Sequence, residues 1–75
     1  MITAYSVKLT TDSPIDSPYY ADFKTMGQLR EWCDRMAESL LRHGKMMHRT
    51  VVFYEVHVQI DGEYEREFES GCYGG

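Results

Sequence analysis

The sequence has little that could cross-link or anchor a protein. It contains two cysteines, Cys33 and Cys72, and they do not form the pattern of a disulfide framework. No stretch approaches the ~18 consecutive apolar residues of a membrane-spanning helix, and the first residues lack the basic and apolar regions of a signal peptide. We therefore expect a soluble protein of the reducing cytoplasm, with no membrane contact.

Motifs that carry catalysis are also missing. There is no glycine-rich phosphate loop, no Gly-x-Ser-x-Gly turn and no metalloprotease helix. His43 and His48 flank two methionines, but Gly44 breaks the helix between them, so their spacing does not fix a metal site. Cys33 falls on an apolar helix face, and Cys72 has no neighbouring base. The sequence therefore predicts a protein that is not an enzyme and uses no metal or cofactor.

Positive charge is scarce. Twelve acidic residues outnumber eight lysines and arginines, which gives a net charge of −4 at pH 7. A protein that binds nucleic acid directly needs a basic surface patch, which this composition does not supply. Although residues 42–49 are locally basic, cations at the end of a helix commonly complement its dipole. We expect no direct binding of nucleic acid, and a partner with a basic protein surface.

What the chain does have is apolar and aromatic residues. Hydrophobic residues make up 43% and aromatic residues 13% of its 75 positions, which is too many for a disordered chain. A chain of this length forms one domain that buries only about 60% of the surface its unfolded form exposes. Such a domain often completes its burial by pairing with a second copy or a partner. We expect a single domain, 1–75, whose glycine-rich residues 70–75 form a loose tail.

Alternation of apolar and polar residues predicts four strands. Residues 2–9 alternate in this way, and residues 19–23 do so over a shorter span. The loop between them contains two Ser-Pro steps, which disfavour both helix and sheet. Residues 50–60 give the strongest strand, and an Asp61-Gly62 turn leads from it into a last strand over residues 63–69.

One amphipathic helix is predicted between the second and third strands. Thr25 and Gln28 have the spacing of a capping box, and Gly44 is a typical residue at a helix end. The order β-β-α-β-β predicts an α+β fold, with this helix packed on a three- or four-stranded antiparallel sheet. The apolar residues of the helix recur at intervals of three and four: Leu29, Trp32, Cys33, Met36, Ala37, Leu40 and Leu41.

The last predicted strand carries a glutamate at every second position. Side chains two residues apart on a strand share a face and lie ~6.8 Å apart, close to the through-space gap between phosphates of one DNA strand. The row could therefore imitate a polyanion. Alternatively, the charges only solvate an edge strand and prevent its aggregation. The four residues are Glu63, Glu65, Glu67 and Glu69.

The register of the last hairpin decides which face the row occupies. A two-residue loop would place carboxylates on the apolar face of the strand 50–60. A three-residue loop with Gly62 in the left-handed conformation instead pairs Gln59 with Glu63 and Val58 with Tyr64. The glutamates then share a solvent face, so we predict a partner-binding surface that comprises Glu55, Asp61, Glu63, Glu65, Glu67 and Glu69.

The segment Asp22–Trp32 has the arrangement Asp-Phe-x-(Ser/Thr)-x-x-Gln-Leu-x-x-Trp. It resembles a strand-to-helix segment of one of the phage-encoded type I-F anti-CRISPR proteins, and the small size, acidity and α+β layout are also similar to that class. Because such inhibitors lack a common fold, no functional residue is carried over. The resemblance implies stoichiometric binding that occludes a nuclease surveillance complex.

The sequence thus leads to a hypothesis and an alternative. The hypothesis is a phage or mobile-element protein that acts in the host cytoplasm and inhibits a nucleic-acid-handling defence complex by occluding its basic surface. The alternative is a non-catalytic accessory or assembly protein that forms a homodimer through an apolar sheet face. The outward residues Val51 and Phe53 would form the dimer seam.

Overall fold

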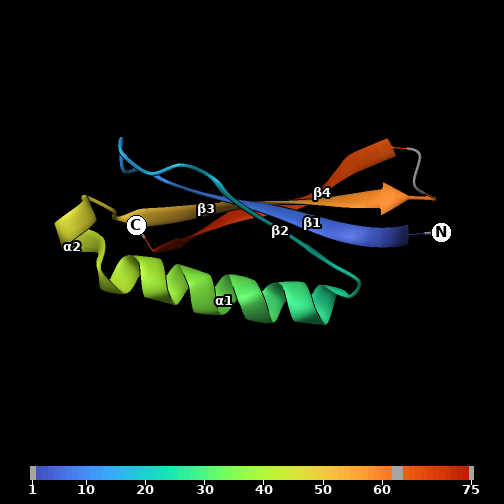
Figure 1. Ribbon diagram of the computed structural model, residues 1–75, viewed down its shortest axis with the longest axis horizontal. Coiled ribbons are helices and arrows are strands. Elements are labelled where there is room, and N and C mark those ends of the chain that lie inside the picture. Colours follow the sequence, from blue (N-terminus) through green and yellow to red (C-terminus); the bar gives the residue numbers. More distant parts are fainter. Residues whose placement is uncertain (1, 62–63, 75) are drawn as a thin grey trace.

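The structure, a computed structural model, describes residues 2–61 and 64–74, without the side chains of residues 64 and 65. The predicted α+β class is confirmed: one main helix lies along one face of a four-stranded antiparallel sheet (Figure 1). The elements are β1 (Ile2–Thr11), β2 (Tyr19–Phe23), α1 (Met26–Arg42), the single-turn α2 (Gly44–Met47), β3 (Val51–Ile60) and β4 (Tyr64–Gly74).

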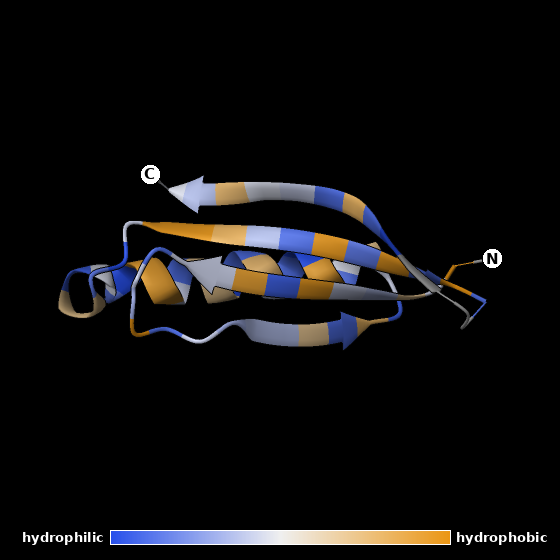
Figure 2. Ribbon diagram, turned by 90° about the horizontal axis from the view of Figure 1, so that it is seen from above, coloured by the Kyte–Doolittle hydropathy of each residue, from blue (hydrophilic) through white to orange (hydrophobic). Residues whose placement is uncertain are grey.

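The strands follow the order β2-β1-β3-β4 across the sheet (Figure 2). The short strand expected at residues 19–23 is confirmed as β2, and it pairs with β1 from Tyr5↔Phe23 to Leu9↔Tyr19. β1 and β3 form the centre of the sheet, with Val7 opposite Val56. The two edge strands are therefore β2 and β4.

The core lies between α1 and the sheet face to which the helix packs. Its side chains come from the apolar stripe of the helix and from alternate positions of β1 and β3, as their periods of about 3.6 and 2 require. Full burial of a residue such as Val or Leu stabilises the fold by about 1.5–3 kcal/mol. The buried residues are Val7, Leu9, Leu29, Cys33, Ala37, Leu40, Val52, Val56 and Val58.

The ends of α1 are set by Thr25 and the chain around Gly44. The hydroxyl of Thr25 accepts a hydrogen bond from the amide of Gln28 at 3.2 Å, which confirms the predicted cap. The helix ends at Arg42, but Gly44 does not lead into a loop, because it begins α2. A Cβ at Gly44 would lie 2.5 Å from the carbonyl oxygen of Arg49, so this close backbone approach requires glycine.

The loop between β1 and β2 is fastened to the segment that follows α2. The side chains of Arg49 and Asp16 form a nearly inaccessible ion pair, 9% and 6% exposed, with Nη2 to Oδ1 at 2.7 Å. These hydrogen bonds lower the pKa of Asp16 to about 2. Asp12 accepts hydrogen bonds from the amides of Thr50 and Val51 at 2.8 and 3.2 Å. The charge of Arg49 is therefore compensated within the molecule by Asp16.

Residues 70–74 belong to β4, so the loose tail predicted for residues 70–75 is wrong for them. β4 pairs with β3 as far as Val51↔Gly74. The glycine content suggested flexibility, but Gly71 lies against the ring of Tyr54, where a Cβ would come within 2.6 Å of the phenol oxygen. Its small size allows close packing between β4 and β3.

Candidate functional site

A β-bulge in β4 divides the predicted row of glutamates. Residues 64–67 pair with residues 60–57 of β3, but the next partner of Val56 is Glu69, which leaves Phe68 as an extra residue. An extra residue reverses which side chains face which side of a sheet with a period of two. The prediction that all four glutamates share one face is therefore wrong.

Before the bulge, the predicted parity is correct although the register differs by two residues. Glu65 pairs with Gln59, and Glu67 pairs with His57, where the sequence predicted Glu63 opposite Gln59. Because Val56 and Val58 face the core, the side chain of His57 and its partner Glu67 belong to the opposite face. Glu63 lies outside the described residues.

After the bulge, Glu69 turns toward the helix. Its carboxylate binds the guanidinium of Arg30 at 2.8 and 3.1 Å and accepts a hydrogen bond from the hydroxyl of Tyr54 at 3.4 Å. The hydrogen bonds from Arg30 lower the pKa of Glu69, and its side chain is only 29% exposed. Glu69 thus fastens β4 to α1 and does not share a face with Glu67.

The face of the sheet opposite α1 carries Glu55 and Glu67 of the predicted partner-binding surface. Within residues 2–61 and 64–74, no helix covers this face, which Figure 2 views from above. Alternation along the strands assigns to it Tyr20 and Asp22 of β2, Ser6, Lys8 and Thr10 of β1, Phe53, Glu55, His57 and Gln59 of β3, and Glu67, Ser70 and Cys72 of β4. We call this surface the open face.

Charges on the open face are arranged around Glu55. Its carboxylate forms a short hydrogen bond with the ring of His57, and Lys8 is its partner across β1. The hydrogen bond with His57, and to a lesser degree the charges of His57 and Lys8, lower the pKa of Glu55. None of the ion pairs found among the described residues involves Glu67, which is exposed. Asp61 is exposed at the turn, with a left-handed φ of 51°.

A groove of about 390 Å³ crosses the open face between β1 and β4. It exists because β4 places small residues, Ser70 and Cys72, opposite Glu55 and Phe53. Phe53 is 45% exposed and lines the groove together with Lys8, Thr10, Glu55, Glu67, Ser70 and Cys72. The sequence predicted that Phe53 and Glu55 share a face. It did not predict the groove, because the residues of β4 that line the groove are positioned by the bulge.

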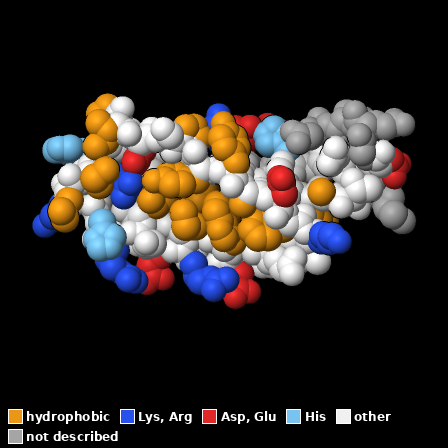
Figure 3. Space-filling model, viewed as in Figure 1, with side chains coloured by type: hydrophobic (Ala, Val, Ile, Leu, Met, Phe, Trp, Pro, Cys, Tyr) orange, Lys and Arg blue, Asp and Glu red, His pale blue; other side chains and the backbone are white. Residues whose placement is uncertain are grey.

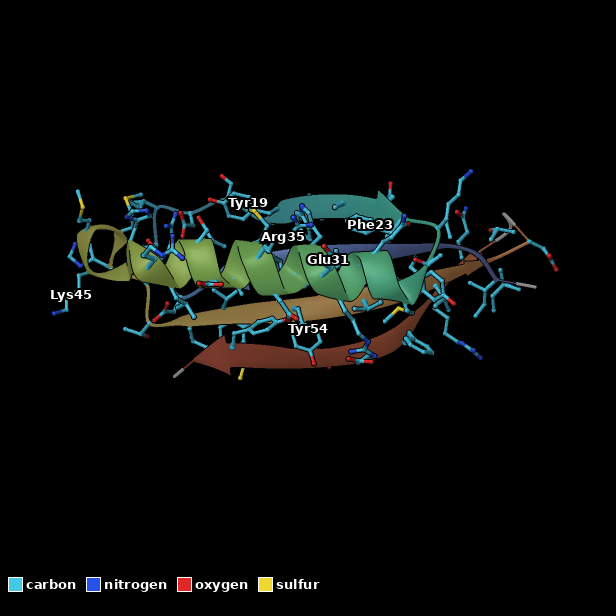
Figure 4. The ribbon with its side chains drawn as sticks, turned by 90° about the horizontal axis from the view of Figure 1, so that it is seen from below. Tyr19, Phe23, Glu31, Arg35, Lys45 and Tyr54 are labelled. Carbon is cyan, nitrogen blue, oxygen red and sulfur yellow. The ribbon has the colours of Figure 1, made fainter. Side chains whose placement is uncertain are left out.

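A larger concavity, of about 690 Å³, lies where β2 leads into α1. The rings of Phe23 and Trp32 are 5.8 Å apart there, and Figure 4 shows Phe23 of β2 alongside Glu31 and Arg35 of α1. Most of its lining comes from the segment Asp22–Trp32. This concavity was not predicted from the sequence, because capping and amphipathicity already explain the segment.

The exposed side of α1 carries charges of both signs. Nη2 of Arg35 lies 3.3 Å from Oε1 of Glu31, and Nη2 of Arg42 lies 2.8 Å from Oε1 of Glu38. Figure 3 shows acidic and basic side chains interspersed along this side of the molecule. A partner of one sign would meet both attraction and repulsion here, so the helix surface is a poorer candidate than the open face for charge-based binding.

The two cysteines differ in exposure. Cys33 is buried, as its place on the apolar helix face predicted, and desolvation raises its pKa to about 11. Cys72 is exposed on the open face. Within the described residues, no three His, Cys, Asp or Glu side chains are grouped as metal ligands. None of the described helices combines the length and apolarity needed to cross a bilayer.

Comparison with known proteins finds no match. No family model fits the chain, and neither a curated protein nor a solved structure matches it. The resemblance of the segment Asp22–Trp32 to an anti-CRISPR protein therefore stays a prediction. What remains to indicate a function is the chemistry of the surface, above all that of the open face.

Proposed function

We propose that the protein is a non-catalytic inhibitor that binds the basic, nucleic-acid-binding surface of a host defence complex and occludes it. The open face carries the contact. The observation on which the proposal rests is that two adjacent strands present carboxylates there: Glu55 on β3 and Glu67 on β4. Glu65 has its register position on the same face, opposite Gln59. Asp61 lies at the turn that follows β3.

The distribution of basic residues supports this choice of surface. Arg30 and Arg49 are bound to Glu69 and Asp16, and Arg35 and Arg42 are bound to glutamates of their own helix. Among the described strand residues of the open face, Lys8 is the one lysine or arginine. The net charge of −4 therefore includes an excess of acid on this face.

The mode of binding is electrostatic complementarity rather than a copy of phosphate spacing. The bulge removes the row of four evenly spaced carboxylates on which such a copy would depend. A cluster of acids still attracts a basic groove, accelerates association and makes binding sensitive to salt. Since a surveillance complex must expose its basic groove to bind DNA, a small acidic protein in that groove would compete with the DNA. The place of action would be the host cytoplasm.

A competition assay tests the proposal. A purified type I-F surveillance complex is incubated with the protein, and binding of target DNA is measured by electrophoretic mobility shift. We expect the wild-type protein to block DNA binding near equimolar ratio and E55Q/E67Q to require at least about tenfold more protein, a loss of about 1.4 kcal/mol. The control E31Q/E38Q removes the same charge from α1 and should inhibit like the wild type.

Two results would contradict the proposal. One is undiminished DNA binding at a large excess of the wild-type protein. The other is equal inhibition by E55Q/E67Q and the wild type, because the carboxylates of the open face would then make no contribution. A circular dichroism spectrum of each variant verifies that the sheet is intact.

The alternative function is that of an accessory protein that dimerises through the open face. It is favoured by one observation: Phe53 and Tyr20, 45% and 71% exposed, both belong to this face, because Tyr20 pairs with Lys8. Light scattering over a dilution series separates the two functions. A tight dimer that is insensitive to salt and is lost in F53S would favour assembly, whereas a monomer leaves the inhibitor as the explanation.

A further inference from the structure

We infer that the groove of the open face receives the side chain of an arginine from the partner's basic surface, held by two carboxylates and by the ring of Phe53. The inference rests on the proposed function and names the partner's anchoring residue. The lining residues that matter are Lys8, Phe53, Glu55, Glu67, Ser70 and Cys72.

The shape of the groove is that of a slot beside an aromatic ring. Phe53 stands between Thr10 of β1 and Cys72 of β4. The side chains of Cys72 and Ser70 are too small to cover the ring from the β4 side. Phe53 therefore stays 45% exposed, and its ring can contact a long, flat side chain that enters from solvent.

The polar groups of the slot match a planar cation. Glu55 pairs with Ser70, while Glu67 pairs with His57, the next outward residue of β3. Such diagonal neighbours on adjacent strands lie ~7–8 Å apart, so their carboxylates can converge on one group between them. A guanidinium has five N–H donors in one plane, directed toward both sides, and can donate to two carboxylates at once.

The ring distinguishes arginine from lysine. A guanidinium is weakly hydrated and stacks on aromatic faces, whereas an ammonium is a strongly hydrated point charge. Contact with Phe53 would favour the arginine by about two- to fivefold in affinity. Lys8, on the opposite wall, can line the slot with its aliphatic stem while its ammonium stays in water.

The larger concavity beside Trp32 does not identify an occupant in the same way. Its rim combines the acids Asp22 and Glu31 with the bases Lys24 and Arg35, so it has no preferred sign of charge. The groove of the open face has two acids and one base among its lining residues, which favours a cation.

The inference is tested by nuclear magnetic resonance on the full-length, ¹⁵N-labelled protein. The probes are three capped hexapeptides, in which glycine alternates with arginine, with lysine or with the uncharged analogue citrulline. With the arginine peptide we expect amide shifts concentrated at Phe53, Glu55, Glu67 and Cys72. The lysine peptide should bind about two- to fivefold more weakly, and the citrulline peptide should give no shifts.

F53L is the matched variant, because it keeps an apolar wall at an exposed position and removes only the ring. It should reduce the preference for the arginine peptide over the lysine peptide. The inference would be overturned by equal affinities in the wild type, by shifts centred on Trp32, or by an arginine preference that is undiminished in F53L. Shifts of the same amides on concentration without peptide would show that a second copy fills the groove, and would also overturn it.

Failure of the inference differs from failure of the proposed function. In one outcome, F53L inhibits the surveillance complex like the wild type and has unchanged peptide selectivity, while E55Q/E67Q does not inhibit. The inference of an arginine in the groove would then be wrong, and the proposed function as an inhibitor would be retained. If the arginine peptide binds as expected but the wild-type protein never blocks DNA binding, the groove does bind arginine, and the proposed target of the protein is wrong.

Discussion

Arg30 of α1 and Glu69 of β4 form a two-point ion pair, with Nη2 to Oε1 at 2.8 Å and Nη1 to Oε2 at 3.1 Å. The pair connects an edge strand to the helix across the margin of the core. It requires Glu69 to face α1, which the bulge at Phe68 permits. The same bulge leaves Glu67 on the open face, so one local irregularity assigns neighbouring acids to two different roles.

This pair predicts a pH-dependent contribution of Glu69 to stability. Because Arg30 lowers the pKa of Glu69 in the folded protein, the stabilisation is fully present above the pKa of an unfolded-chain glutamate, about 4.3. It is lost as the pH falls through the lower, folded value. The free energies of unfolding of wild type and E69Q, measured in urea, should differ at pH 7 and converge toward pH 3. A difference that persists at pH 3 would contradict the assignment.

The sequence predicted the elements well because each has a local cause. The apolar residues of α1 recur with the helical period, Thr25 supplies the cap, and alternation marks β1 and β3. Even the short β2 has its inward residues at positions 19, 21 and 23, as expected from the pattern, with Phe23 and Tyr19 opposite Tyr5 and Leu9.

The bulge was not predicted, although the sequence contains a sign of it. Phe68 and Tyr73 are both large and apolar, but one is at an even and the other at an odd position, so no regular strand can turn both toward the core. In the structure, Phe68 lies 6.3 Å from the ring of Tyr5, and Tyr73 lies 5.4 Å from that of Tyr54. The position of the bulge depends on tertiary partners, Arg30 among them, that lie far away in sequence.

Gly71 and Gly27 should respond in opposite ways to alanine. A Cβ at Gly71 would lie 2.6 Å from the phenol oxygen of Tyr54, whereas a Cβ at Gly27 meets nothing within 4 Å. We expect G71A to destabilise the protein by about 1–3 kcal/mol through overpacking. G27A should stabilise it by up to about 1 kcal/mol through helix propensity. Thermal and urea unfolding measure both changes, and a neutral G71A would mean that β4 does not pack on Tyr54.

The two thiols should react at very different rates. Burial raises the pKa of Cys33 to about 11, so about one molecule in a thousand carries its thiolate at pH 8, and the group is also inaccessible. Cys72 is exposed. Titration of the native protein with a chromogenic disulfide reagent should therefore release one equivalent quickly and the second only after denaturation. C72S should lose the fast phase, and a fast phase that remains would place Cys33 at the surface.

Lys8 should weaken the binding of a cation in the groove of the open face. Lys8 lines the same groove as Glu55 and Glu67, and two unit charges ~7 Å apart in water repel each other by about 0.6 kcal/mol. K8M keeps an unbranched apolar stem and removes the charge, so it should bind the arginine hexapeptide about threefold more tightly at low salt. Salt screens the repulsion, and the gain over the wild type should shrink at 0.5 M NaCl.

The control for Lys8 is a lysine that does not line this groove. K45M removes the same charge from α2, where Figure 4 shows Lys45 projecting into solvent. It changes the net charge of the protein as K8M does, so it measures the effect of overall charge on peptide binding. If K45M strengthens binding as much as K8M does, the peptide responds to the net charge and not to the groove, and the position of the cation would have to be sought elsewhere.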